Sequence, residues 1–170
     1  MIRNRALPMS FASPKNKKVV SRTMAYTLQA ILAAHGAFSG KTLPKGFRIV
    51  HLRCGLEMLP LASELRAVQR IPFFPLIDGN GAEVPVTLLS LFESLGAQSP
   101  LAYVEAEYFG GEGTQAHALI SEGKLIRPPV VSSSAINGAL LYLGVTKGEF
   151  RDEFEAAGLD AHRDTDQWLA

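Results

Sequence analysis

The chain has 170 residues, of which 47% are hydrophobic and 19% are charged, a composition typical of a single globular domain. No apolar run approaches the roughly 20 residues that span a bilayer. The single cysteine, Cys54, excludes an internal disulfide and a C-x-x-C zinc motif. We therefore expect a cytoplasmic protein that has no contact with a membrane.

The net charge of +1 is unevenly distributed along the chain. Residues 1–23 carry six basic side chains and no acidic one, so the other 11 basic and 16 acidic residues give the remainder a net charge of −5. Poor periodicity and two prolines predict a flexible basic extension at 1–23, followed by one α+β domain at 24–170. The arm has the charge of a nucleic-acid tail, but these features favour a dispensable extension. Three methionines are candidate translation starts: Met1, Met9 and Met24.

Short strands are predicted for the first third of the domain. Residues 24–33 alternate imperfectly and favour a strand, although their alanines also suit a helix. The glycines and proline of 36–46 predict a loop. Residues 47–52 and 56–61 are then predicted to be partner strands around a turn at 53–55.

Helices are predicted on both sides of a long loop. Residues 62–69 suit a short helix, and 71–85 a loop with an exposed pair of phenylalanines, Phe73 and Phe74. The next helix is clearer, because Pro85 suits a first helical position and an apolar stripe follows it. Gly96 is expected to end that helix.

Residues 101–120 predict a strand, a glycine turn and a second strand. Side chains alternate across a strand, so Tyr103, Glu105 and Glu107 share one face, with the two carboxylates roughly 6.5–7 Å apart. If the small residues of both strands face the helices, Gln115 and His117 join the carboxylates on the open face. A polar cluster on a rigid hairpin is the result.

Three glycines, Gly110, Gly111 and Gly113, lie between these strands. They lack the G-K-[ST] ending of a phosphate loop, and the acidic residues around them would repel an anion. A tight or bulged turn is therefore favoured. Three glycines exceed what a simple turn needs, which predicts either a bulge or a close approach to the backbone.

The last third predicts an extended segment and two helices. Two prolines keep 125–131 extended, a serine within 132–134 caps a helix to about Leu143, and a second helix covers 147–157. Trp168 in the polar tail either docks back on the domain or contacts a partner. The expected architecture is an α+β fold, with an antiparallel sheet and helices packed mainly on one face.

The reactive side chains form no recognised catalytic motif. Glu105, Glu107 and His117 have the chemistry to bind a divalent metal or to serve as acid and base, yet H-E-x-x-H and D-x-D patterns are missing. Cys54 is interpreted as an incidental thiol, and helix capping explains the serines at 132–134. His35 and His51 are interpreted as structural or surface residues, and no cofactor is predicted.

Three segments, AYVEAEYFGGEGTQ, INGALLYLGV and HRDTDQW, resemble a family of small bacterial proteins to which we attach no activity. The resemblance covers Met24 to Trp168 and leaves the basic arm outside. It implies a bacterial cytoplasmic origin and a start near Met24. It assigns no catalytic residue.

The sequence favours a non-enzymatic protein that binds another macromolecule, for example an immunity-type or accessory protein of a bacterial conflict or secretion system. An acidic body and an acidic strand face suit a basic protein partner. The alternative is a metal-assisted hydrolase or transferase that uses Glu105, Glu107 and His117. The oligomeric state is left open. The predicted binding residues are Tyr103, Glu105, Glu107, Gly110, Gly111, Gly113, Gln115, His117 and Trp168.

Overall fold

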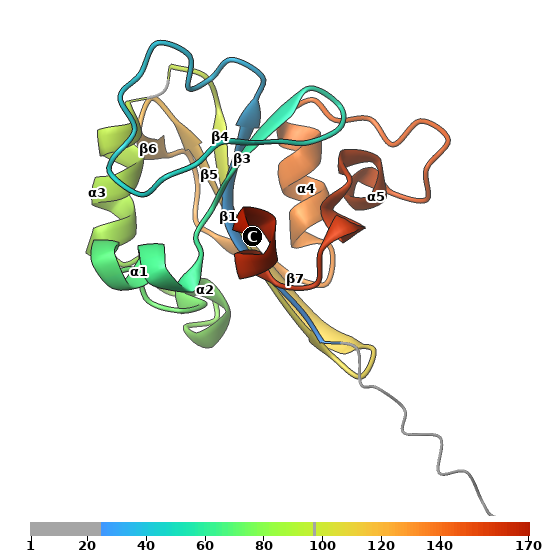
Figure 1. The fold of residues 1–170 in the computed structure, drawn as a ribbon. Helices are drawn as coiled ribbons and strands as arrows, with labels where there is room; N and C mark the ends of the chain where they lie inside the picture. The colour runs from blue at the N-terminus through green and yellow to red at the C-terminus, as the bar shows by residue number, and fades with distance from the viewer. Residues whose placement is uncertain (1–24, 97) are drawn as a thin grey trace, which may run out of the picture.

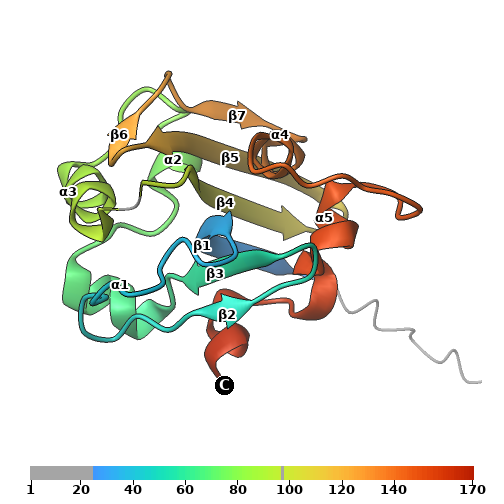
Figure 2. The same cartoon turned by 90° about the horizontal axis from the view of Figure 1, so that it is seen from above.

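A computed structural model describes residues 25–96 and 98–170, so the predicted extension at 1–23 lies outside the described residues. An antiparallel sheet runs through the middle of the molecule with helices on either side (Figures 1 and 2). The strands are β1 (Tyr26–Ala34), β2 (Val50–His51), β3 (Leu56–Pro60), β4 (Leu101–Phe109), β5 (Glu112–Ser121), β6 (Lys124–Leu125) and β7 (Val130–Ser132).

The α+β class and the antiparallel sheet are confirmed, and the strands follow the order β2-β3-β1-β4-β5-β6, with β7 also paired to β5. None of the helices within the described residues has the length and apolarity that crossing a membrane requires. The helices are α1 (Ser63–Gln69), α2 (Pro75–Asp78), α3 (Val86–Leu95), α4 (Ala135–Tyr142), α5 (Glu153–Ala157) and the 3-10 helices η1 (Leu159–Ala161) and η2 (Thr165–Leu169).

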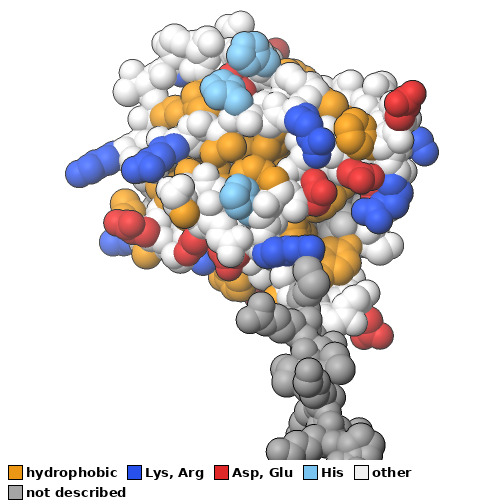
Figure 3. Space-filling view, turned by 45° about the vertical axis from the view of Figure 1, so that its right-hand side comes forward, with side chains coloured by type: hydrophobic (Ala, Val, Ile, Leu, Met, Phe, Trp, Pro, Cys, Tyr) orange, Lys and Arg blue, Asp and Glu red, His pale blue; other side chains and the backbone are white. Residues whose placement is uncertain are grey.

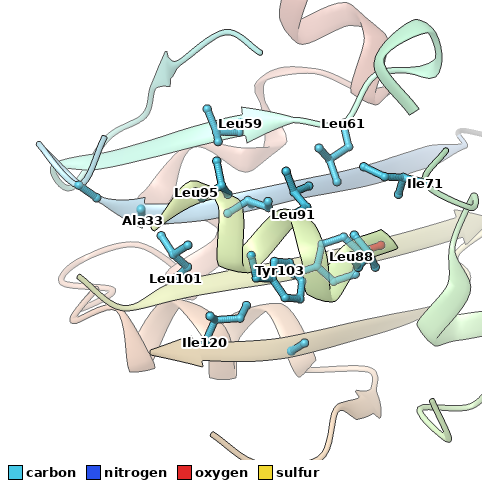
Figure 4. Close-up of a cluster of buried hydrophobic side chains, with 14 of the residues drawn as sticks. Ala33, Leu59, Leu61, Ile71, Leu88, Leu91, Leu95, Leu101, Tyr103 and Ile120 are labelled. Carbon is cyan, nitrogen blue, oxygen red and sulfur yellow. The ribbon is translucent and has the colours of Figure 1, made fainter. Parts of the chain in front are cut away.

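Helices cover both faces of the sheet, which corrects the expectation that they lie mainly on one. Helices α1, α2 and α3 pack on one face, and their leucines meet Leu59, Leu101 and Tyr103 of the strands (Figure 4). Helices α4 and α5 pack on the other face against Leu28, Val104 and neighbouring strand residues. Both faces of the central strands are therefore buried, so burial on this sheet does not alternate.

The β4–β5 hairpin turns through Gly110 and Gly111, both at positive φ, and Phe109 pairs with Glu112. A two-residue turn of this kind fixes the register. Odd-numbered residues of β4 consequently face even-numbered residues of β5, so Glu105 lies opposite Ala116, and Val104 opposite His117.

The C-terminal segment, residues 159–170, bonds to the edge of β1 that β3 leaves unpaired. Strand β3 pairs only with residues 30–34 of β1. The Thr27 amide donates to the Arg163 carbonyl at 2.9 Å, and the Gln29 amide donates to Thr165 Oγ1 at 3.0 Å. Trp168 is partly buried beside His162 and packs against the helix α4–α5 core. Of the two roles predicted for Trp168, the structure shows docking on its own domain.

Several predicted boundaries need correction. The strand predicted at 47–52 is confined to Val50–His51, and the helix predicted at 147–157 is confined to Glu153–Ala157. Asp152 caps that helix, because its side chain accepts a hydrogen bond from the Glu155 amide. The loop predicted at 71–85 contains α2, where Phe74 is buried and only Phe73 is exposed. The remaining predicted strands and helices agree with the structure to within a few residues.

Candidate metal centre

The polar cluster predicted on the hairpin does not form. Glu105 is fully buried on the face covered by α1, α2 and α3, whereas His117 lies on the face covered by α4. The sheet separates the two side chains, so they cannot hold one ligand. The prediction that Gln115 and His117 join Glu105 and Glu107 on one open face is therefore wrong. It assumed that the small residues of β4 and β5 share a face, whereas they lie on opposite faces and helices cover both.

Glu105 caps a helix instead of facing solvent. One carboxylate oxygen accepts from the Leu76 amide at 2.9 Å and from the Tyr103 hydroxyl at 2.7 Å, and the other accepts from the Ile77 amide at 2.8 Å. These amides belong to the first turn of α2, where free N–H groups attract negative charge. Burial raises the pKa of the Glu105 carboxyl, and these hydrogen bonds partly oppose that rise.

The other predicted hairpin residues also have structural roles. Gln115 Nε2 donates to the Tyr108 hydroxyl at 2.7 Å, and its Oε1 accepts from the Ile136 amide at 2.9 Å. His117 Nδ1 lies 2.6 Å from the Ala135 carbonyl oxygen, and burial lowers the pKa of this imidazole. Glu107 is half-buried near the turn of the hairpin.

The third hairpin glycine is explained by a close approach to the backbone. A Cβ on Gly113 would lie 2.4 Å from the Tyr108 ring and 2.3 Å from the Glu107 carbonyl oxygen. Tyr108 therefore lies over its cross-strand partner, and only a glycine leaves room for it. A bound anion is not needed to account for the three glycines.

A different group of side chains does converge. His35 follows the last residue of β1, His51 lies on β2, and Glu57 lies on β3 between them. Glu57 is the register partner of both Ala33 on β1 and His51 on β2, and opposed residues share a face of a sheet. Three adjacent strands thus bring two imidazoles and a carboxylate to one end of the sheet.

The three side chains lie within reach of one ion. Glu57 Oε1 is 3.5 Å from His35 Nδ1 and 3.9 Å from His51 Nδ1, and one ligand atom from each residue lies within 4.8 Å of the other two. In a tetrahedral site, bonds of about 2.0–2.1 Å separate two ligand atoms by about 3.3–3.4 Å. The separations of 3.5 and 3.9 Å from Glu57 Oε1 are close to that value.

Burial differs sharply within the group. The side chains of His35 and His51 are 73% and 66% exposed, whereas that of Glu57 is 4% exposed. Glu57 Oε1 accepts from the Gly36 amide at 3.0 Å, but Oε2 is buried and has no hydrogen-bond partner among the described residues. A buried carboxylate oxygen without a partner is costly, and it is the kind of atom that a cation satisfies.

The surface around the sheet carries no large patch of one charge on the face that Figure 3 displays. Acidic and basic side chains are interspersed there, and histidine side chains adjoin each other near the top of the view, with another nearer the middle. The acidic face that motivated a basic partner is not available in the predicted form, since its central residue, Glu105, is buried.

Comparison with protein-family models, with curated proteins and with solved structures found no match for this chain. The site is therefore interpreted from its own geometry. The resemblance to a bacterial family stays a prediction.

Proposed function

We propose that the protein binds one divalent transition metal ion through His35, His51 and Glu57, with Zn²⁺ as the best-suited ion. The observation that carries this proposal is the convergence of the two exposed imidazoles on Glu57 Oε1, at 3.5 and 3.9 Å from His35 Nδ1 and His51 Nδ1. The other oxygen of this buried carboxylate, Oε2, has no hydrogen-bond partner among the described residues. Imidazole nitrogen and carboxylate oxygen are ligands that zinc accepts readily.

Three protein ligands leave room for a water molecule on the exposed side of the site. Catalytic zinc sites use such a set, and bound Zn²⁺ lowers the pKa of its water toward neutrality. This chain would position the ligands through the register of β1, β3 and β2, and the Gly36 amide would hold the carboxylate through a hydrogen bond to Oε1. The proposal concerns binding, and it assigns no reaction.

Isothermal titration of the chelator-treated full chain, freed of any histidine tag, with ZnCl₂ tests the proposal. We expect one ion per chain. Glu57→Gln, His35→Ala and His51→Ala should each weaken binding by more than about 100-fold, because even residues that only orient a ligand are worth about 10–100-fold.

His162→Ala provides the matched control, since it removes a histidine that packs beside Trp168, away from the site. It should leave the affinity unchanged. Zinc binding that survives Glu57→Gln and both histidine variants, or no stoichiometric binding by the wild type, would overturn the proposal. The rival explanation is a protonated histidine paired with Glu57, which requires no metal.

The predicted protein partner remains a prediction that no contact of the described residues tests. Glu105 cannot belong to such an interface without rearrangement. Phe73 and Phe109 are exposed aromatic residues, but nothing indicates what would cover them.

A further inference from the structure

The metal site lies at both ends of the loop formed by residues 36–49. His35 directly precedes this loop, and His51 is the second residue of β2, which directly follows it. The loop contains no helix or strand. Its two ends are therefore the points at which a bound ion would attach it to Glu57 on β3.

Few backbone hydrogen bonds hold this loop to the rest of the domain. The amides of Ala37, Ser39, Lys41 and Phe47 donate only to carbonyls three residues earlier in the chain. The Gly36 amide is the exception within the described residues, because it donates to Glu57 Oε1. Side chains supply further attachment: Lys41 Nζ donates to the Leu95 and Gly96 carbonyls at the end of α3. The buried Phe38 and the partly buried Leu43, Phe47 and Ile49 pack against the core.

Strand β2 is also weakly attached. It pairs with β3 through only two residues, Val50 opposite Met58 and His51 opposite Glu57. Segments with short ladders and local hydrogen bonds open at lower free energy than the core. A ligand that binds only the closed form opposes that opening by mass action.

The same loop forms one wall of a groove of about 590 Å³. Lys45, Gly46 and Arg48 line it from the loop, Ser63 and Val68 from α1, and Asp166 and Leu169 from the C-terminal segment. Arg48 is three residues from His51 in the chain, so the position of this wall depends on where β2 lies.

We propose that the metal ion regulates the loop: binding at His35, His51 and Glu57 holds residues 36–52 against β3 and thereby fixes the loop wall of the groove. This inference rests on the proposed function. The ion can contact all three ligands, His35, His51 and Glu57, only in the closed form, so it must shift the loop toward that form by its differential affinity.

Hydrogen exchange of the wild-type chain and Glu57→Gln, with and without Zn²⁺, tests the coupling. At a free zinc concentration 100 times the Kd, local opening that breaks the site should become about 100-fold rarer. We expect amides in 36–52 of the wild type to exchange more slowly by up to that factor, with the largest effect near His51. Residues 145–152, an irregular segment beside α4 and α5, serve as the internal control.

Titration on the same samples separates the outcomes. Stoichiometric zinc binding with no more slowing at 36–52 than at 145–152 overturns this inference alone. Absence of zinc binding overturns the proposed function and this inference with it. Equal slowing at 36–52 in Glu57→Gln also overturns the coupling, because that variant lacks the ligand on β3.

Discussion

Two buried glutamates of the same sheet have opposite surroundings. Glu105 accepts three hydrogen bonds that occupy both of its oxygens, whereas Glu57 accepts one from Gly36 and leaves Oε2 without a partner among the described residues. Both are almost inaccessible to water. Burial alone therefore does not distinguish a structural carboxylate from a candidate ligand. The number of carboxylate oxygens that accept a hydrogen bond does distinguish them.

The largest effect should come from removing the satisfied carboxylate. Glu105→Ala leaves the amides of Leu76 and Ile77 and the Tyr103 hydroxyl without their acceptor. Each buried group left unpaired costs about 1–3 kcal/mol, so we expect a loss of about 3 kcal/mol or more in the free energy of unfolding. Urea denaturation in the presence of a chelator measures it.

Glu57→Gln is the comparison variant in the same experiment. It removes a charge that is poorly compensated without metal, so the metal-free protein should change by less than about 1 kcal/mol. A larger loss from Glu57→Gln than from Glu105→Ala would reverse the roles that we assign to the two residues.

The stability gained on adding zinc should distinguish Glu57 from Glu105. At 100 times the Kd, zinc should stabilise the wild type and Glu105→Gln alike by about 2.7 kcal/mol. Glu57→Gln should gain nothing. Thermal melts with ZnCl₂ and with chelator provide the measurement, and equal shifts in all three proteins would indicate binding elsewhere.

A smaller effect concerns pH. Because burial raises the folded-state pKa of Glu105, the folded chain binds more protons than the unfolded chain above the carboxyl's ordinary pKa of about 4.3. The stability from this group is present below that value and is lost as the pH rises through the raised pKa. Denaturation at several pH values should show a more negative slope for the wild type than for Glu105→Gln.

The difference between the two proteins is the informative quantity in that experiment. His117 contributes a slope of opposite sign, because its folded-state pKa is lowered by burial and its stability is lost as the pH falls below its ordinary value of 6.5. Both proteins contain His117, so its contribution cancels. Identical slopes would mean that Glu105 titrates alike in the folded and unfolded chains.

Glu107→Ala should have the smallest effect. Glu107 shares a strand face with Glu105 but is half-buried near the turn of the hairpin, with no side-chain hydrogen bond among the described residues. We expect a change of less than about 1 kcal/mol by the same urea denaturation. A loss comparable to that of Glu105→Ala would show that the whole strand face, and not the capping contact, carries the effect.

Local patterns in the sequence predict much of this fold. The strand at 24–33, the helix ending before Gly96 and the glycine turn at 110–111 all follow from side-chain periodicity and backbone preferences. The side chains of β4 alternate as predicted, but the face of Tyr103 and Glu105, which was predicted to be open, is buried under α1, α2 and α3. The assumption that the small residues of both strands share a face also failed. It is equivalent to a register shifted by one residue, which moves every side chain of β5 to the other face. A two-residue Gly110–Gly111 turn, if assumed, would have given the correct face for His117.

The candidate metal centre was missed for a related reason. His35 and His51 are far apart in the chain and neither lies in a known ligand motif, so each was interpreted alone. The predicted turn at 53–55 already placed His51 opposite Glu57, which was a usable signal. The approach of His35 depends on β1 lying beside β3, a long-range pairing that periodicity does not determine.

The closure of β1 by the C-terminal segment has a consequence for how the chain is made. The Gln29 amide donates to Thr165 Oγ1, and the Tyr26 hydroxyl donates to the Leu159 carbonyl. Both acceptors lie more than 130 residues later in the chain. During synthesis on the ribosome, the N-terminal part of β1 has an unpaired edge until those residues emerge. Unpaired strand edges can pair with other chains. Nascent chains halted before residue 159 should therefore depend most on chaperones that shield exposed strands.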